Sequence, residues 1–112
     1  MPTPISSIRN LGPAAEAAFA RAGIQSAGRL RELGADAAYK ALLESGQPPH
    51  FIGYYVLVMA LQGRPWNDCK GAEKEVLRLR FDALKAGAMK KARSELEAAL
   101  DFFGILPARA GS

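Results

Sequence analysis

The sequence predicts a small all-α protein, and three observations lead to that class. At 112 residues the chain has the size of one domain with a core of its own. Its 11 glycines and 7 prolines divide it into short segments in which apolar residues recur at helical spacing. No stretch shows the alternating pattern of a half-buried β-strand. We therefore expect a compact five-helix domain followed by an additional C-terminal helix.

The composition restricts the class of protein further. Apolar residues make up 49% of the chain and aromatic residues 8%, which is typical of a packed domain and not of a disordered chain. The net charge of +4 permits an acidic partner such as DNA without establishing one. The single cysteine and single histidine cannot supply an internal disulfide or the usual ligands of zinc. We expect a cytoplasmic protein that uses no metal and no cofactor.

A membrane location is not expected. The N-terminus lacks the basic and then apolar pattern of a signal peptide. The longest apolar run, residues 51–61, is much shorter than the roughly 20 residues that a membrane-spanning helix needs.

The turn at residues 8–12 and the helix after it are the best-defined local features. Residues 1–7 before them are expected to form a flexible arm. Pro13 suits the first position of a helix over about residues 13–22, because its fixed φ and missing N–H cost nothing there. Gly12 permits a left-handed turn or the close approach of a ligand, and the exposed amides of a helix start favour phosphate. The turn is either a phosphate contact or a structural joint between packed helices. Its candidate nucleic-acid contacts are Arg9, Asn10, Gly12, Ala14, Ala15 and Arg21.

The next three helices have recognisable ends. Ser26 is a favourable N-cap for a second helix, which is expected to end at Gly34. A third helix is expected over about residues 36–44. The fourth is predicted over about residues 48–62, and its side chains are apolar nearly all round. A helix of that kind lies at the centre of a core, with other helices on most sides.

The fifth helix, over about residues 70–86, carries two apolar stripes. Before it, Trp66 is expected to fold back onto the core and Asp68 to cap the helix. One stripe contains Ala72, Val76, Leu79 and Ala83. The other contains Leu77, Phe81, Leu84 and Ala88. Since one stripe can face the fourth helix, the other needs a second partner.

The segment over residues 87–104 could supply that partner. Its apolar residues recur at steps of three and four, which is the pattern of a coiled-coil seam: Met89, Ala92, Leu96, Ala99 and Phe103. The segment could fold back on the fifth helix or join a homodimer. Gly87 is either the break or part of one continuous helix, where it would cost about 1 kcal/mol. Residues 105–112 are expected to be a tail. The candidate partner or dimer contacts are Leu77, Phe81, Leu84, Met89, Leu96 and Phe103.

Basic residues gather in the second half of the chain. Residues 64–93 contain nine Lys or Arg against four Asp or Glu. Four of the cations fall within one quadrant of the fifth helix: Lys70, Lys74, Arg78 and Lys85. A nucleic-acid patch of this kind would contact phosphates, with strong salt dependence and little base selectivity. The alternative is an ordinary solvated face.

No catalytic constellation is present in the sequence. His50 follows a proline without an evident nucleophile or metal partner, so a role at a helix start or on the surface is expected. Cys69 has no resolving cysteine and is expected to be a partly exposed thiol. The pair Tyr54 and Tyr55 is expected in the core. An enzyme is not predicted.

Several short motifs, in their order and spacing, resemble the C-terminal domain of the TfoX/Sxy regulators of DNA transformation (competence). They are Asn10-Leu11-Gly12-Pro13, Ala22-Gly23-Ile24, Leu30-Arg31-Glu32-Leu33-Gly34-Ala35, Ala38-Tyr39, and Ala60-Leu61-Gln62-Gly63 followed by Trp66-Asn67. The resemblance covers about residues 5–85 and implies a five-helix fold related to helix-hairpin-helix (SAM-like) domains, here expected over residues 8–86. The Asn-Leu-Gly turn also looks like that of the C-terminal domain of the bacterial RNA polymerase α subunit, which contacts DNA and activators.

The sequence departs from the family pattern at several points. Family members typically carry a separate N-terminal domain, so the chain is either a stand-alone version or a piece of a two-domain protein. Ala14 lies where many DNA-binding hairpins place a lysine, and Glu16 where they tend to place an alanine. Both changes weaken phosphate binding at the turn.

The resemblance implies a regulatory function. The main hypothesis is a non-enzymatic adaptor domain in the transcriptional control of DNA uptake, acting through a protein partner in the transcription machinery with an accessory DNA contact. The alternative is a sequence-independent DNA-binding helix-hairpin-helix domain. A third hypothesis is a purely structural module detached from a larger chain.

Overall fold

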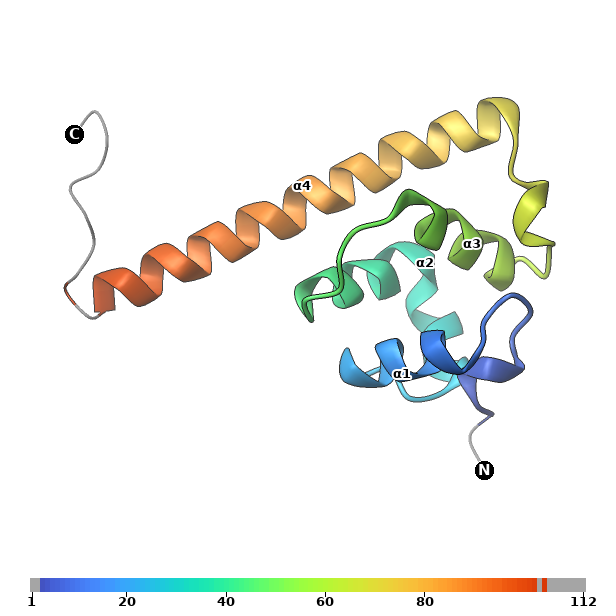
Figure 1. The fold of residues 1–112 in the computed structure, drawn as a ribbon, viewed down its shortest axis with the longest axis horizontal. Coiled ribbons are helices and arrows are strands. Elements are labelled where there is room, and N and C mark those ends of the chain that lie inside the picture. Colours follow the sequence, from blue (N-terminus) through green and yellow to red (C-terminus); the bar gives the residue numbers. More distant parts are fainter. Residues whose placement is uncertain (1–2, 103, 105–112) are drawn as a thin grey trace.

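A computed structural model describes residues 3–102 and 104 (Figure 1). Within these residues the chain forms α-helices and short 3-10 helices and no β-strand, which confirms the all-α class. The elements are the 3-10 helix η1 (Ile5–Ser7), α1 (Pro13–Arg21), α2 (Ala27–Glu44), α3 (Phe51–Leu61), the 3-10 helix η2 (Trp66–Asp68) and α4 (Gly71–Phe102).

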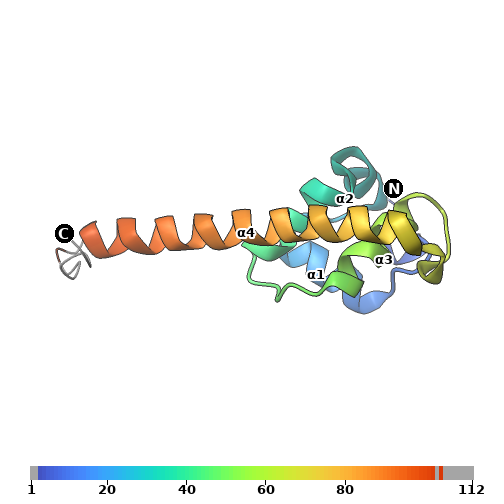
Figure 2. The ribbon, with the colours of Figure 1, turned by 90° about the horizontal axis from the view of Figure 1, so that it is seen from above.

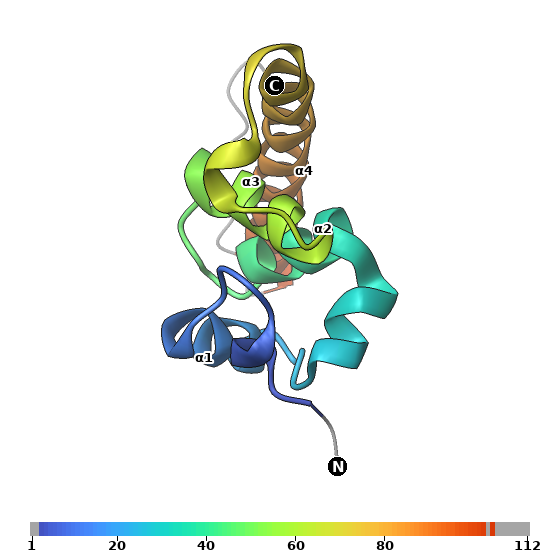
Figure 3. The ribbon, with the colours of Figure 1, turned by 90° about the vertical axis from the view of Figure 1, so that its right-hand side faces the viewer.

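The helices form a compact body from which α4 extends. α2 and α3 lie between α1 and α4, as the end-on view shows (Figure 3). The first half of α4 packs across α2 and α3, and its second half continues past them as a single straight helix (Figures 1 and 2). The molecule is consequently elongated, with principal extents of 51 × 38 × 20 Å.

The predicted central helix is α3. Tyr54 and Met59 on this helix are fully buried and Leu57 is nearly so, because neighbouring elements cover most of its sides. Tyr55 is buried as well, so the two tyrosines belong to the core as expected. Ile52, in the first turn, is an exception at 54% exposure.

The number of α-helices differs from the prediction. The second and third predicted helices form one element, α2, which is kinked at Gly34 (φ 81°, ψ 167°). Only glycine adopts this conformation without strain, so Gly34 interrupts the helical backbone and divides α2 into two segments. Because these segments follow each other directly, α2 counts as one of four α-helices in the described part, and the five-helix count is not confirmed. Ser26 is the N-cap as predicted, and its hydroxyl accepts a hydrogen bond from the Arg29 N–H.

α4 also joins two predicted elements. It passes through Gly87 without a break, which agrees with the continuous alternative and excludes a segment folded back on the fifth helix. Its core-facing stripe is the one containing Leu77 and Phe81, which are each 3% exposed. On the other stripe, Val76 is 53% and Leu79 is 71% exposed.

Three local expectations are wrong. The described part of the expected arm is packed, since Ile5 is fully buried and the carbonyl of Thr3 accepts a hydrogen bond from the Ala27 N–H. Trp66 does not fold back onto the core, because it is 48% exposed. Asp68 does not cap α4, which starts at Gly71. It ends η2, and its carboxylate accepts a hydrogen bond from Arg64. The tail expected at residues 105–112 lies outside the described residues.

Candidate functional site

The turn before α1 is joined to the turn before α4. Asn10 has a φ of 71°, in the left-handed region that asparagine tolerates better than most residues. Its side-chain Nδ2 donates a hydrogen bond of 2.9 Å to the backbone carbonyl of Arg64. Gly12 has an extended backbone (φ −110°, ψ −170°) and not a left-handed one. In this structure the turn connects two motifs that lie 54 residues apart.

The Arg64 side chain holds the second of these turns. Its guanidinium donates to both carboxylate oxygens of Glu73 at 2.7 and 2.8 Å and to Asp68 at 2.7 Å. The hydrogen bonds to Glu73 and Asp68 raise the pKa of Arg64. The hydrogen bonding with Arg64 in turn lowers the pKa of Glu73. The arginine therefore fixes the start of α4 to the end of α3 and serves the fold.

The start of α1 already has a carboxylate beside it. Glu16 accepts a hydrogen bond of 2.9 Å from the Ser6 N–H, and the hydrogen bonding with Ser6 lowers the pKa of its carboxyl group. This negative charge lies in the first turn of α1, where it would repel a phosphate at the exposed residues Gly12 and Ala14. Arg9 and Arg21 are exposed too, and neither forms an ion pair with another described residue. The phosphate contact stays a prediction, with Glu16 acting against it.

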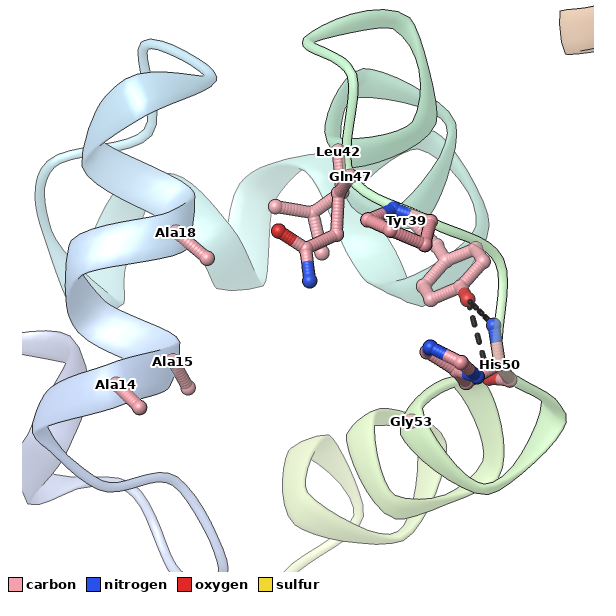
Figure 4. Close-up of a pocket in the computed structure, with 9 residues that line it drawn as sticks. Ala14, Ala15, Ala18, Tyr39, Leu42, Gln47, His50 and Gly53 are labelled. Carbon is pink, nitrogen blue, oxygen red and sulfur yellow. Dashed lines mark hydrogen bonds between the residues drawn. The ribbon is translucent and has the colours of Figure 1, made fainter.

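A mostly apolar cleft of about 240 Å³ lies between α1 and the segment that links α2 to α3 (Figure 4). Ala14 and Ala15 point into it, so these two side chains line a cleft. The Tyr39 hydroxyl fixes the opposite wall by accepting from the His50 N–H at 2.9 Å and donating to the His50 carbonyl at 3.1 Å. Burial raises the pKa of Tyr39. His50 itself precedes α3 as its N-cap residue and is exposed, as expected for a residue at a helix start.

The cations of the fifth predicted helix lie beside aromatic rings of α3 and α4. The Lys74 Nζ is 5.0 Å from the ring centre of Tyr55, and the Arg78 guanidinium is 5.1 Å from that of Phe51. The Lys85 Nζ is 5.6 Å from the ring centre of Phe81. Cation–π contacts at exposed sites contribute about 0.5–1 kcal/mol each, so these side chains have a structural role whatever they bind.

The four cations remain available to a partner. Lys70, Lys74 and Arg78 are exposed and Lys85 is half-buried. Arg78 also forms an ion pair of 3.2 Å with Asp82. The structure thus aligns three of the predicted cations along α4, and Lys70 precedes the helix.

A polar cluster that the sequence pattern missed fixes α4 to α2. Arg80 donates two hydrogen bonds to the carboxylate of Asp36, at 2.6 and 3.1 Å, and the buried Tyr54 hydroxyl donates to the same carboxylate. Burial opposes ionisation of Asp36, but the hydrogen bonds from Arg80 and Tyr54 outweigh it and lower its pKa. Burial and the neighbouring Asp36 raise the pKa of Tyr54. Asp36 and Arg80 are 44 residues apart, so no local motif could have indicated this contact.

The predicted partner contacts divide into two groups. Leu77 and Phe81 are buried and Leu84 packs against the same cluster, so these three side chains contribute to the core of their own chain. Met89 is 59% and Leu96 is 60% exposed, and both lie in the second half of α4. Phe103 lies outside the described residues.

Neither a metal centre nor a reactive thiol is found in the described part of the chain. No three residues among the His, Cys, Asp and Glu of this part gather as metal ligands. Cys69 is 3% exposed and not partly exposed as expected, and burial raises the pKa of its thiol. None of the described helices combines the length and the apolar character that spanning a membrane requires.

The fold and these surfaces define the chain as a small all-α domain with an extended C-terminal helix. Residues 1–81 match the TfoX C-terminal domain, and the chain belongs to this family. A search of the curated proteins and a search of the solved structures each found no match. The match ends within the first half of α4, so the extended half lies outside the part shared with the family.

Proposed function

We propose that the chain is a non-enzymatic regulatory domain that acts in the transcriptional control of DNA uptake, through contact with a protein of the transcription machinery. Membership of the TfoX C-terminal domain family supports the connection with competence. The observation that carries the protein contact is the pair of exposed apolar residues, Met89 and Leu96, on the second half of α4. Met89 and Leu96 lie on one face of the helix with Ala92 between them, and a contiguous exposed apolar patch rimmed by polar residues is typical of protein-binding surfaces.

The chemistry of the described surface supports a binding role over a catalytic one. The cleft beside His50 has an apolar lining of alanine, leucine, tyrosine and proline with one glutamine. No carboxylate, serine or cysteine of the described residues lines this cleft, and the Tyr39 hydroxyl is already bonded to the backbone of His50.

The proposal is tested in the bacterium that encodes the chain. A reporter of DNA-uptake genes is measured in a deletion strain that carries either the full chain or the double variant Met89→Ser/Leu96→Ser. Binding of both purified proteins to RNA polymerase is measured by sedimentation. We expect the double variant to lose both reporter activation and binding. Full activation and unchanged binding by the double variant would contradict the proposal. The matched control is Val76→Ser/Leu79→Ser, since it alters two exposed apolar residues on the other stripe of α4.

A second candidate function is sequence-independent DNA binding, which the alignment of Lys74, Arg78 and Lys85 along α4 favours. Such binding to phosphates weakens steeply with salt, by orders of magnitude between about 50 and 200 mM when many phosphates are contacted. The measurement is the fluorescence anisotropy of a labelled duplex over this range of salt.

Charge-reversed variants separate the two possible DNA contacts. Lys74→Glu/Arg78→Glu removes the α4 cations, and Gly12→Asp adds a charge at the start of α1, where aspartate is an acceptable N-cap. The control is Arg31→Glu/Lys40→Glu, which makes the same change in net charge on exposed residues of α2. DNA binding by this domain is excluded if the duplex does not bind at low salt, or if neither test variant weakens binding more than the control does.

A further inference from the structure

We propose that the extended half of α4 docks an acidic amphipathic helix of a partner protein. The docking surface, called here the α4 strip, consists of Lys85, Met89, Ala92, Arg93 and Leu96. The inference rests on the proposed function, which makes the partner a protein. It adds the chemistry by which the α4 strip recognises that protein.

The α4 strip has an apolar floor at helical spacing. Met89, Ala92 and Leu96 follow one another at steps of three and four residues, so they share one face of the helix. Beside this face, the segment between α2 and α3 contributes Pro49 to a groove of about 170 Å³ that Met89 and Ala92 also line. A groove of this size accepts one large apolar side chain, and a helix in such a groove places further apolar residues at i+3, i+4 and i+7.

Nothing within the described part of the chain covers the outer end of this floor. The end of α2 lies beside Ala88, Lys91, Ala92 and Glu95. After Glu95, α4 continues to Phe102, and Figure 2 shows no other helix beside its far end. An isolated helix shorter than about 12–15 residues is marginal in water. A partner on the α4 strip would therefore bury Leu96 and also stabilise the helix that presents it.

The charges around Met89 select an acidic partner. Lys85 and Arg93 lie four residues before and after Met89, on the same side of the helix. Neither forms an ion pair with a carboxylate in the described residues, whereas Lys91, near α2, is paired with Glu44 at 3.2 Å. Lys85 lines the groove and Arg93 lies one turn beyond Met89. With no carboxylate partner in the part of the chain that the structure describes, both complement glutamate or aspartate beside the apolar face of a docked helix.

A second copy of the chain fits the same surface less well. The a and d positions of the seam are Met89, Ala92, Leu96 and Ala99. When two such seams pair antiparallel, e positions face e positions and g positions face g positions, so Arg93 meets Arg93 and Glu95 meets Glu95. In a parallel pair, Glu95 faces Leu100. Neither orientation gives a complementary charge pair, so a partner that supplies the acids is the better occupant.

The test uses the full chain and a fluorescein-labelled helical peptide that has leucines at i, i+4 and i+7 and glutamates beside them. Two control peptides replace the glutamates by glutamine or the leucines by serine. We expect micromolar binding by anisotropy, weakened about tenfold by Leu96→Ser and by either control peptide. Leu79→Ser is the matched control variant, since Leu79 is also exposed but lies about 100° from Leu96 around the helix.

Charge recognition is tested separately. Lys85→Glu/Arg93→Glu should weaken binding of the glutamate peptide by about tenfold and leave the affinity for the glutamine peptide unchanged. The proposal is overturned if the glutamate peptide does not bind, if Leu79→Ser weakens binding as much as Leu96→Ser does, or if the charge reversal affects both peptides equally.

Further measurements test whether a second copy of the chain or DNA occupies the α4 strip instead. They also distinguish failure of the docking inference from failure of the proposed function. A dimer in sedimentation of the free chain that Leu96→Ser dissociates would make a second copy the occupant, and displacement of the peptide by duplex DNA would make it nucleic acid; either result overturns the docking of an acidic helix. If Met89→Ser/Leu96→Ser abolishes reporter activation and binding to RNA polymerase but the glutamate peptide does not bind the chain, the docking inference fails while the proposed function stands. If the peptide binds as expected but the reporter ignores the deletion, the proposed function fails alone.

Discussion

The two halves of α4 belong to one helix but have different environments. Leu77 and Phe81 in the first half are buried under α2 and α3, whereas Met89 and Leu96 in the second half are more than half exposed. Both halves carry apolar residues at the same spacing. The comparison shows that periodicity predicts a helix with an apolar face but does not say whether that face meets the same chain or another one.

The largest expected difference between the two halves is in their local stability. Amides around Phe81 should exchange hydrogen only by global unfolding, because core contacts hold that part of α4, while amides around Leu96 open by fraying of the helix. Hydrogen exchange followed by mass spectrometry should show protection at Phe81 equivalent to the full free energy of unfolding, about 5–15 kcal/mol, and little at Leu96. Equal protection in the free chain would mean that the second half of α4 is already covered, for instance in a dimer.

Truncating one apolar side chain in each half of α4, Phe81 or Leu96, should lower the free energy of unfolding by different amounts. Phe81→Ala removes a ring that packs against those of Tyr39, Phe51 and Tyr54, and should lower the free energy of unfolding by about 3–5 kcal/mol. Leu96→Ala removes an exposed side chain and should change it by less than about 0.5 kcal/mol. Urea denaturation measures both, and a loss of more than about 1 kcal/mol for Leu96→Ala would show that its side chain is buried.

The polar contact between α4 and α2 should have an intermediate effect. Asp36→Ala removes the acceptor of Arg80 and leaves the buried Tyr54 hydroxyl without its partner. We expect a loss of about 1–2 kcal/mol in urea denaturation. The control Glu32→Ala removes an exposed carboxylate whose only ion pair in the described residues is to Arg29, and it should have little effect. Equal losses for the two variants would contradict a role for Asp36 in attaching α4.

The same contact predicts a dependence on pH. The pKa of Asp36 is lower in the folded chain than its ordinary value of 3.8. A carboxyl group with a lowered folded pKa stabilises the fold above its unfolded pKa, and this contribution is lost as the pH falls through the folded pKa. Stability should therefore fall below about pH 4, and the fall should be smaller in Asp36→Asn, which keeps the shape of the side chain. An identical pH profile for the two proteins would show that the ion pair does not contribute.

Features that depend on local chemistry could be predicted from the sequence. Pro13 and Ser26 start helices as their backbone preferences require, and α3 is central because its residues are apolar nearly all round. Gly34 was correctly identified as an interruption, but whether a glycine ends a helix or only bends it depends on the packing on both sides. Gly87 shows the third outcome, a glycine inside an uninterrupted helix.

Features that depend on contacts distant in sequence could not be predicted. The choice between the stripes of Phe81 and Leu79 is made by α2 and α3, and the partners of Arg80 and Asn10 lie 44 and 54 residues away. Of the candidate site residues, those at the start of α1 and along the cations of α4 remain predictions. Partner contact by the exposed Met89 and Leu96 also stays a prediction, because periodicity alone does not say which apolar residues of α4 the rest of the chain covers.

The smallest expected effect tests the connection between the two halves at Gly87. This residue is helical and exposed, and a methyl group built on it meets no atom within 4 Å. Gly87→Ala should therefore raise the helical signal in circular dichroism, with a gain of up to about 1 kcal/mol in the helical state of α4, because alanine loses less backbone entropy than glycine. The gain should appear mainly as slower exchange of the amides after residue 87, since the first half is already held by the core. If alanine instead lowered the helical signal, Gly87 would adopt a turn that alanine disfavours, the two halves would be separate helices, and the α4 strip would not form in the free chain.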